Sequence, residues 1–255
     1  MPTIAIGDIH GNLAALNDLL ARIQPVCGRG DTVVFVGDYI DRGPDSKGCV
    51  DAILAFQRET PAEVVCLLGN HEDWFLRTMQ DYREHAWWLA MDAWPTVRSY
   101  SPEAEAALRK AATAAGAGLF ESRIELPYGA FFDALPEAHR RFFQSLQLSH
   151  QNADGFFSHA GVDGHFALSA QPREALVWGD DAFPDSYRGQ EVVVYGHWRN
   201  VVLSDDGWPM PLGVGHTIGI DSIAHGVLTA IRLPDREVFQ SARHPCDDEV
   251  IRQPE

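Results

Sequence analysis

A run of apolar residues, Val33 to Val36, ends abruptly at Gly37 and Asp38, and this junction strongly constrains the fold. Consecutive β-branched and aromatic residues are typical of a strand buried on both faces, as in a parallel sheet covered by helices. In such sheets the ligand crevice lies beyond the carboxyl ends of the strands. The sequence therefore predicts an α/β fold in which Asp38 lies at a functional edge.

Four further apolar runs end in the same way, in Asp, Asn or His beside a glycine. These runs lead to Asp8 and His10, to Asn70 and His71, to His159, and to His197. One such junction is weak evidence, because a capping aspartate or a core histidine produces the same pattern. Five junctions together indicate a shared site, since burying so many ionisable side chains without partners is costly. The mixed nitrogen and oxygen set favours Mn²⁺, Fe or Zn²⁺ over Ca²⁺ or Mg²⁺, and its lack of thiolates argues against a structural zinc.

Composition excludes several classes of function. The chain has 255 residues, 45% of them hydrophobic, which is enough for one large α/β domain or two small ones. Its net charge of −16 argues against general binding to nucleic acid or to anionic membranes. The start of the chain lacks a signal-peptide pattern and no apolar run reaches about 18 residues, so we expect a cytoplasmic protein. Cys27, Cys49, Cys66 and Cys246 form no CxxC pair, which favours buried thiols in a reducing compartment.

The order of patterns along the chain predicts an α/β core with an insertion. Helices are expected after the candidate caps Asn12 and Ser46. Residues 74–148 have a different texture, with an Ala/Glu-rich helix at 102–115 and another at 136–146, and are interpreted as an inserted helical cap.

The tryptophans in this region, Trp74, Trp87, Trp88 and Trp94, are interpreted as packing rather than as a platform for substrate. After the insertion the sequence is β-rich, with strands expected at 217–220 and 227–233. A closing hairpin turns at Pro234-Asp235, and a loose tail follows from about Arg243.

Five motifs together resemble those of the calcineurin-like metallophosphoesterases. In chain order they are GDIHG (7–11), GDYIDRG (37–43), GNHE (69–72), SHAG (158–161) and YGHW (195–198). The match is to the phosphoprotein phosphatase branch, which includes small bacterial Ser/Thr phosphatases and symmetrical diadenosine tetraphosphatases. The resemblance implies a single domain over residues 1–255, built as a four-layer α-β-β-α sandwich with the helical cap inserted. Gly219-Ile220-Asp221 and Leu228-Thr229-Ala230 resemble the strand pair that closes such domains.

The resemblance also implies a binuclear metal centre. It assigns six ligands to two divalent metal ions: Asp8 and His10 to the first, Asn70, His159 and His197 to the second, and Asp38 to both. Mn²⁺ is the expected metal, with Fe or Zn²⁺ as alternatives. Two such ions lower the pKa of a bridging water, so that the resulting hydroxide attacks phosphorus directly and in line. Gly215-His216 offers another Gly-His pair, but the strand directly before His197 favours His197 as the ligand.

Three further residues acquire catalytic roles through the same resemblance. His71 is the expected proton donor to the leaving oxygen, and Asp41 would orient its ring. Arg42 would bind two phosphate oxygens, which a lysine cannot mimic. The alternatives are that His71 only donates a supporting hydrogen bond, and that Asp41 and Arg42 form a local ion pair.

Two departures from the family pattern affect the substrate site. Relatives commonly carry a second phosphate-binding arginine two residues after a tryptophan, whereas Trp178 is followed here by Gly179 and Asp180. Arg188 and Arg199 are the candidate replacements. The usual Asp-Thr-Gly near the C-terminus is also changed, so His225 is a candidate for the pocket wall.

The resulting hypothesis is a phosphatase acting on phosphomonoesters, either phosphorylated Ser, Thr or Tyr of proteins or a small phosphorylated metabolite. Asp41 and the GNHE form of the third motif favour it. The alternative is a symmetrical diadenosine tetraphosphatase, a dinucleoside polyphosphate hydrolase, favoured by Gly196-His197-Trp198 but opposed by the aspartate kept before Arg42. A binding module without activity is a third hypothesis, which the complete ligand set disfavours. The substrate, the native metal pair and the oligomeric state stay open.

Overall fold

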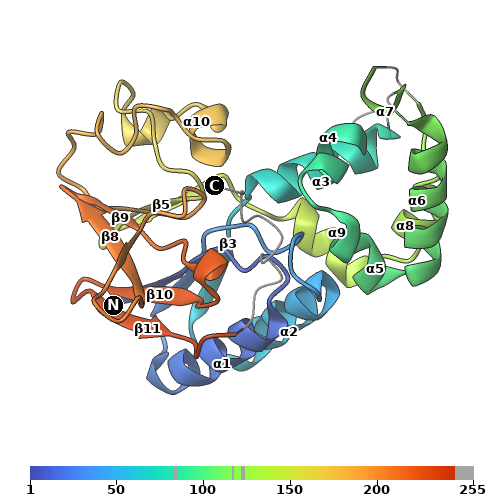
Figure 1. Ribbon diagram of the computed structural model, residues 1–255. Helices are drawn as coiled ribbons and strands as arrows, with labels where there is room; N and C mark the ends of the chain where they lie inside the picture. Colours follow the sequence, from blue (N-terminus) through green and yellow to red (C-terminus); the bar gives the residue numbers. More distant parts are fainter. Residues whose placement is uncertain (83–84, 117, 122–123, 245–255) are drawn as a thin grey trace.

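The computed structural model describes residues 1–82, 85–116, 118–121 and 124–244, which form two β-sheets with helices on their outer faces (Figure 1). The first sheet, in the order β11-β10-β1-β2-β3, contains β1 (Thr3–Ile6), β2 (Thr32–Phe35), β3 (Glu63–Cys66), β10 (Thr229–Leu233) and β11 (Glu237–Gln240). The second sheet, in the order β4-β5-β6-β9-β8-β7, contains β4 (Ser149–Asn152), β5 (Gly155–Ser158), β6 (Val193–Tyr195), β7 (Val201–Leu203), β8 (Pro209–Val214) and β9 (Thr217–Gly219). Strands β1, β2 and β3 are parallel, as are β5, β6 and β9.

Helices cover the outer faces of both sheets. Against the first sheet lie α1 (Leu13–Ile23) and α2 (Ser46–Glu59), and against the second lies α10 (Arg173–Val177) (Figure 1). The segment between β3 and β4 contains α3 (Asn70–Gln80), α4 (His85–Ala90), α5 (Trp94–Tyr100), α6 (Pro102–Ala115), α7 (Gly118–Glu121), α8 (Gly129–Asp133) and α9 (Glu137–Gln144). Short 3₁₀ turns are η1 (Gln24–Val26), η3 (Leu168–Ala170) and η4 (Ile223–His225).

The alternation of side chains explains why the strands are apolar on both faces. In β2, Val33 and Phe35 pack toward α1 and α2, whereas Val34 packs between the two sheets. In β6, Val194 faces the same inter-sheet layer, and Val193 faces α10. Because each strand is covered twice, polar alternation is absent. The predicted α-β-β-α order of layers is confirmed.

The starts of the first two helices differ in detail from the prediction. Asp45, not Ser46, caps α2, because its Oδ1 accepts a hydrogen bond from Gly48 N at 2.7 Å. Asn12 does occupy the cap position of α1, but its side chain donates to the carbonyl oxygen of His10 at 2.8 Å and accepts no capping hydrogen bond from the helix. Asn12 therefore braces the loop that carries His10.

The helical segment has its own aromatic core, centred on Phe75. This side chain contacts the rings of Trp88, Phe131, Phe132 and Phe143, and it is fully buried. The helices expected at 102–115 and 136–146 are present as α6 and α9. We propose that this segment is an insertion into one domain covering the whole chain.

The four tryptophans of this segment differ in burial: Trp74, Trp88 and Trp94 pack in or against one hydrophobic core, whereas Trp87 is 61% exposed. Trp88 is buried beside Phe75, and Trp94 lies under the guanidinium group of Arg109, 4.4 Å from its ring. Trp74 and Trp87 instead stack on each other at 6.3 Å. Packing explains Trp88, whereas the Trp74–Trp87 pair needs a separate explanation.

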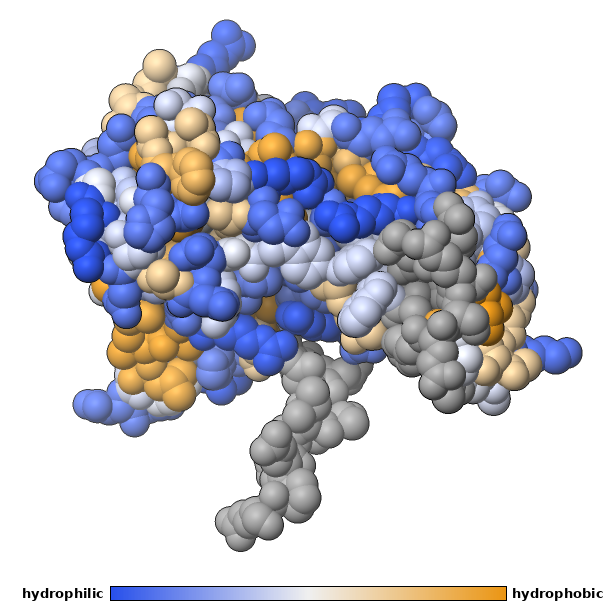
Figure 2. Space-filling model, turned by 90° about the horizontal axis from the view of Figure 1, so that it is seen from above, coloured by the Kyte–Doolittle hydropathy of each residue, from blue (hydrophilic) through white to orange (hydrophobic). Residues whose placement is uncertain are grey.

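The remaining surface features fit the composition. None of the described helices is both long and apolar enough to cross a membrane. Figure 2 shows one face of the molecule as mainly hydrophilic, with its hydrophobic residues in separate patches.

Cys27, Cys49 and Cys66 are buried free thiols. Of the expected loose tail, His244 donates its backbone N–H to Gly226 O; residues 245–255, with Cys246, lie outside the described residues.

We predict that Phe75→Ala will lower the free energy of unfolding by about 3–5 kcal/mol, because it leaves a cavity among four aromatic rings. Urea unfolding followed by circular dichroism measures this change. Phe166→Ala is the control, since Phe166 is 51% exposed and should change stability by less than about 0.5 kcal/mol. Similar losses in both variants would contradict the assignment of Phe75 to a core.

Candidate active site

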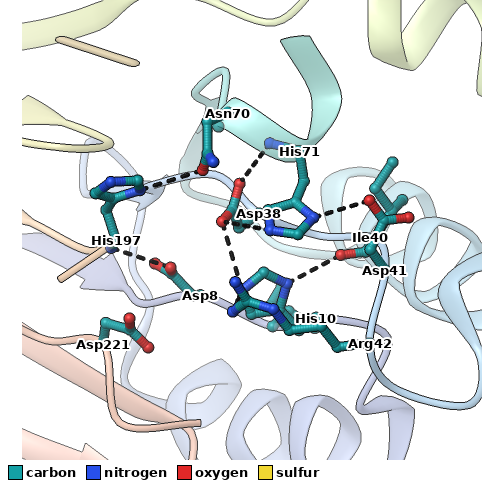
Figure 3. A network of polar contacts seen from close by, with 12 residues as sticks. Asp8, His10, Asp38, Ile40, Asp41, Arg42, Asn70, His71, His197 and Asp221 are labelled. Carbon is teal, nitrogen blue, oxygen red and sulfur yellow. Dashed lines mark hydrogen bonds and ion pairs between the residues drawn. The ribbon is translucent and has the colours of Figure 1, made fainter. Parts of the chain in front are cut away.

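Five strand ends deliver polar side chains to one buried cluster (Figure 3). Asn70 Oδ1 lies 3.0 Å from His159 Nε2 and 3.2 Å from His197 Nδ1. Asp38 Oδ1 lies 3.4 Å from His159 Nε2, and Asp8 Oδ2 accepts a hydrogen bond from the backbone N–H of His197 at 3.0 Å. The residues singled out at the ends of β1, β2, β3, β5 and β6 are thus brought together from both sheets.

The glycines beside these residues permit the close approach. A Cβ on Gly69 would overlap Asp38 Oδ1, and one on Gly196 would overlap Asp8 Oδ1. Gly37 has a φ of +115°, and a Cβ there would lie 2.9 Å from His159 Nδ1. The repeated glycine in the sequence pattern therefore has a steric cause, because any side chain at Gly69 or Gly196 would displace a carboxylate of the cluster.

Several residues of this cluster also have strained backbone conformations. Among the described residues, the non-glycine positions with positive φ at this site are His10 (45°), Asp38 (52°), Asp41 (70°), Arg42 (65°), His197 (64°) and Arg199 (52°). Such conformations cost free energy and persist where surrounding contacts hold them, commonly at functional sites. The backbone N–H groups of Ile9 and His10 donate to Asp38 O at 2.9 and 2.8 Å and provide part of this support.

The first half of the cluster contains His10, Asp38 and His71, whose ligand atoms all lie within 4.8 Å of one another. His10 Nδ1 donates to the backbone oxygen of Ile40 at 3.0 Å, which leaves Nε2 as an acceptor without a proton, 3.4 Å from Asp38 Oδ2. Arg42 Nη1 lies 2.6 Å from the same His10 nitrogen. Burial, followed by the charge of Arg42, lowers the pKa of His10 well below its usual value.

The second half contains Asp38, His159 and His197. His159 Nδ1 donates to Val36 O at 3.1 Å, so its Nε2 is an acceptor facing the oxygen of Asn70. Burial lowers the pKa of His159 and of His197 to about 3, which keeps both rings neutral. Asn70 Oδ1 and Asp38 Oδ1 converge within 3.0 to 3.4 Å of His159 Nε2, an arrangement of acceptor atoms that suits a cation.

Asp8 and Asp221 add two more buried carboxyl groups beside the two halves. Asp8 Oδ1 and Asp221 Oδ1 are buried and have no hydrogen-bond partner. Burial raises the pKa of Asp221 to about 6, and burial together with Asp221 and Asp38 raises that of Asp8. The chemistry of these donors fits two divalent cations that share Asp38, because cations would satisfy the orphaned oxygens and offset the crowded charge.

His71 and Asp41 form a fully buried pair beside the cluster. His71 Nδ1 donates to Asp41 Oδ2 at 2.8 Å, and the same carboxylate accepts from Trp88 Nε1 at 3.0 Å and Thr96 Oγ1 at 2.6 Å. His71 Nε2 has no hydrogen-bond partner and lies 3.9 Å from Asp38 Oδ2. Burial lowers the pKa of His71 to about 4. The Asp41 carboxylate is thus hydrogen-bonded to His71. It is not paired with Arg42, which was the alternative drawn from the sequence.

Several residues of the site were missed by the sequence reasoning. Glu72 accepts hydrogen bonds from the backbone N–H groups of Asp38 and Tyr39, both at 2.9 Å, and so fixes the loop after β2. Glu72 is the last residue of the GNHE motif, and that position in the motif could have indicated a role in the site. Asp221 is the last residue of Gly219-Ile220-Asp221, which was recognised only as part of a strand. Nothing in the sequence next to Trp88 or Thr96 indicates that they contact the site.

The three candidates for the substrate pocket, Arg199, Arg188 and His225, lie in different places relative to the cluster. Arg199 is exposed at its rim: its backbone N–H donates to Asp221 Oδ2 at 2.9 Å, and its charge lowers the pKa of His71. Arg188 instead donates to the carbonyl of Tyr187 and lines a separate hollow of about 470 Å³. His225 is half-buried in η4, with its backbone N–H on Ser222 O. The structure therefore brings Arg199, not Arg188, to this site.

Residues 1–200 match the family model described as calcineurin-like phosphoesterase. The chain belongs to this family of metallophosphoesterases, which are phosphoric ester hydrolases. The asymmetrical bis(5'-nucleosyl)-tetraphosphatase PrpE of Oceanobacillus iheyensis is 26% identical over 265 residues, which cover 94% of this chain and 92% of the relative. Serine/threonine-protein phosphatase 1 of Salmonella typhimurium is 36% identical over 105 residues, 40% of this chain and 44% of the relative. The resemblance drawn from the five motifs is confirmed.

Solved structures show the same fold. A putative diadenosine tetraphosphatase aligns with a TM-score of 0.61 at 19% identity, covering 94% of this chain and 92% of that structure. A cold-active protein-tyrosine phosphatase of a Shewanella species aligns with a TM-score of 0.52 at 16% identity, covering 94% and 80%. At these identities the likeness concerns the fold alone.

We predict that Asp38→Ala will lower bound Mn²⁺ from about two ions per chain to almost none, because Asp38 faces both halves of the cluster. His159→Ala should retain about one ion, since it removes a donor from one half only. Mass spectrometry of metal after gel filtration measures the content. His216→Ala is the control, because His216 is exposed outside the cluster. Equal metal content in all three variants would be incompatible with this assignment.

Proposed function

We propose that the protein is a two-metal-dependent phosphatase that hydrolyses phosphomonoesters, on phosphorylated side chains of proteins or on a small phosphorylated metabolite. The buried His71–Asp41 pair carries this proposal, because His71 Nε2 is unpartnered and adjoins the cluster. A serine or threonine alkoxide is a poor leaving group and needs a proton as its bond to phosphorus breaks. The leaving group of a dinucleoside polyphosphate is a nucleoside phosphate, which is a much weaker base than an alkoxide and needs such a proton less.

The chain's own residues supply positioning and the proton. Asp8, His10, Asp38, Asn70, His159 and His197 would hold two divalent ions, with Mn²⁺ expected and Fe or Zn²⁺ as alternatives. When bound, these ions lower the pKa of a shared water and neutralise the phosphoryl oxygens. Asp41 accepts from His71 Nδ1 and so orients the ring, and its carboxylate would stabilise the second proton that His71 must carry on Nε2 to protonate the leaving oxygen.

Arg42 is the proposed clamp on the transferred phosphoryl group. Its guanidinium group is half-buried, and its Nη1 lies 2.6 Å from His10 Nε2, beside the first half of the cluster. A guanidinium presents a planar fork of N–H groups that matches two phosphate oxygens. Arg199 supplies a second positive charge at the rim.

Hydrolysis of dinucleoside tetraphosphates is the second candidate function. The PrpE relative supports it, because the similarity extends over 94% of this chain. The dinucleotide would bind the same cluster through its phosphates, and its leaving group would depend less on His71.

We also infer a cytoplasmic, reducing location. The three buried cysteines, Cys27, Cys49 and Cys66, support it as free thiols. The negative net charge argues against nucleic acid and anionic membranes as partners.

We predict that His71→Asn will lower kcat for phosphoserine by about 100-fold or more, because the general acid is lost. The loss should be much smaller for p-nitrophenyl phosphate, whose leaving group needs little protonation. Steady-state kinetics with Mn²⁺ and a parallel metal analysis test this. An equal loss on both substrates, with metal retained, would reject His71 as the acid.

The same assays decide between the two candidate functions. Unmodified protein is compared on phosphoserine, phosphothreonine and phosphotyrosine peptides and on diadenosine tetraphosphate. A higher kcat/KM for the peptides supports the first candidate, and a higher value for the dinucleotide supports the second. Activity that survives complete removal of metal by EDTA would contradict both.

We predict that Arg42→Ala will lower kcat/KM for phosphomonoesters by about 10- to 100-fold, the usual size for a lost charge-assisted contact. Arg42→Lys should restore little, because a lysine ammonium cannot form the paired contact. The matched control is Arg188→Ala, since Arg188 lies in a separate hollow. If Arg188→Ala matched the loss in Arg42→Ala, the clamp would be misassigned.

A further inference from the structure

An exposed indole stack lies beside the proposed catalytic site. Trp74 follows Asn70 by about one turn of α3, so both lie on one face of that helix. Helical side chains lean toward the N-terminus of their helix, which brings the Trp74 indole toward the turn that carries Asn70. Trp87 stacks on Trp74 with 6.3 Å between ring centroids and 20° between planes, and it is 61% exposed. The stack therefore presents an open aromatic surface.

Helix α4 links this stack to the acid pair. Trp88, the residue after Trp87, is buried and donates its Nε1–H to Asp41 Oδ2 at 3.0 Å. Trp178 packs its edge against Trp74 at 5.9 Å and donates to Asp73 Oδ2 at 3.0 Å. The indole of Trp74 is thus fixed on two sides, and Trp87 is the outermost ring.

Positive charge accompanies the aromatic surface. The buried carboxylate of Asp73 accepts from Arg173 at 2.7 Å and Arg77 at 3.0 Å, and the side chains of both arginines are 42% exposed. Arg77 also lies over the Trp74 ring, 5.1 Å from its centroid. Two guanidinium groups on one carboxylate leave a net positive charge, in a chain whose net charge is −16.

We propose that Trp87, backed by Trp74, binds the nucleobase of a nucleotide substrate, and that Arg77 and Arg173 attract its anionic part. All of the nucleobases stack well on indole rings, and guanidinium groups bind phosphate. This inference rests on the proposed function and names a substrate class for it, since a nucleotide is a small phosphorylated metabolite.

An aromatic side chain of a phosphopeptide fits the subsite less well. A phosphotyrosine ring is bonded directly to the phosphate that the metal ligands would hold. Trp74 lies about one helical turn, roughly 5.4 Å, along α3 from Asn70, and Trp87 stacks on Trp74 with 6.3 Å between the ring centroids. In a nucleotide, a ribose separates the base from the phosphate. This ribose would span part of the distance between the metal-ligand cluster and the Trp87 ring.

The test measures binding and catalysis separately. Isothermal titration calorimetry of 5'-AMP and diadenosine tetraphosphate with EDTA-treated protein reports binding without metal or turnover. We expect Trp87→Ala to weaken nucleotide binding about ten-fold or more, and Trp87→Phe to retain most of it. Phe166→Ala, which removes another exposed ring, should bind as the unmodified protein does. With Mn²⁺, Trp87→Ala should lower the kcat/KM for the nucleotide relative to that for phosphoserine by a similar factor.

The outcomes separate this proposal from the proposed function. Nucleotide affinity in Trp87→Ala equal to that in Phe166→Ala overturns the subsite, even if the protein hydrolyses phosphoserine. A loss confined to phosphotyrosine peptides overturns it in favour of a peptide subsite. Binding that depends on Trp87, in a protein without phosphatase activity, supports the subsite and rejects the proposed function.

Discussion

Asp38 faces both halves of the cluster, and the rest of the site is arranged around this one carboxylate. Its Oδ2 lies 3.4 Å from His10 Nε2, and its Oδ1 lies 3.4 Å from His159 Nε2. The residue is 2% exposed and has a positive φ, so its position is costly in both solvation and backbone conformation. The hydrogen bond from its N–H to Glu72 and the space left by Gly69 make this position accessible. Divalent cations would compensate the buried charge that remains.

The two-sheet architecture is what allows ligands from distant parts of the chain to meet. Strands β1, β2 and β3 contribute from the first sheet, and β5 and β6 contribute from the second. The inter-sheet core, which includes Val34, Phe157 and Val194, holds the two edges in register. A single sheet would place its strand ends in a row, whereas two facing sheets surround a small volume from two sides. The same packing excludes water from the polar atoms at the edge.

Much of this candidate site could be predicted from local patterns, because each strand end is followed within a few residues by a candidate ligand. The junctions at Asp8, Asp38, Asn70, His159 and His197 each combine an apolar run, a glycine and a ligand within a few residues. These short-range features survive in the fold, since the strands are continuous up to the edge of each sheet.

The parts that escaped prediction depend on contacts between distant segments. Trp88 and Thr96 reach Asp41 from helices far along the chain, and nothing near them in the sequence indicates a polar partner. Arg188 and Arg199 looked equivalent as isolated arginines, and only the path of the loop after β6 places the second at the rim. The β7–β8 pair was also missed, because β7 has only three residues and β8 contains two prolines and a glycine, which are uncommon inside strands. Residue type and spacing do not encode these placements locally.

The helical segment contributes to chemistry rather than only covering the site. Five of the six metal-ligand candidates belong to the sandwich and its loops, and the sixth, Asn70, is the first residue of α3. The hydrogen bonds that hold Asp41 come instead from Trp88 in α4 and Thr96 in α5. Trp88 in turn packs on Phe75, at the centre of the aromatic core of this segment. Packing inside the segment is therefore coupled to the orientation of the proposed acid, while the metal cluster is positioned by the strand ends. A change that loosens α4 or α5, but leaves α3 with Asn70 and Glu72 in place, should affect proton delivery before it affects metal binding.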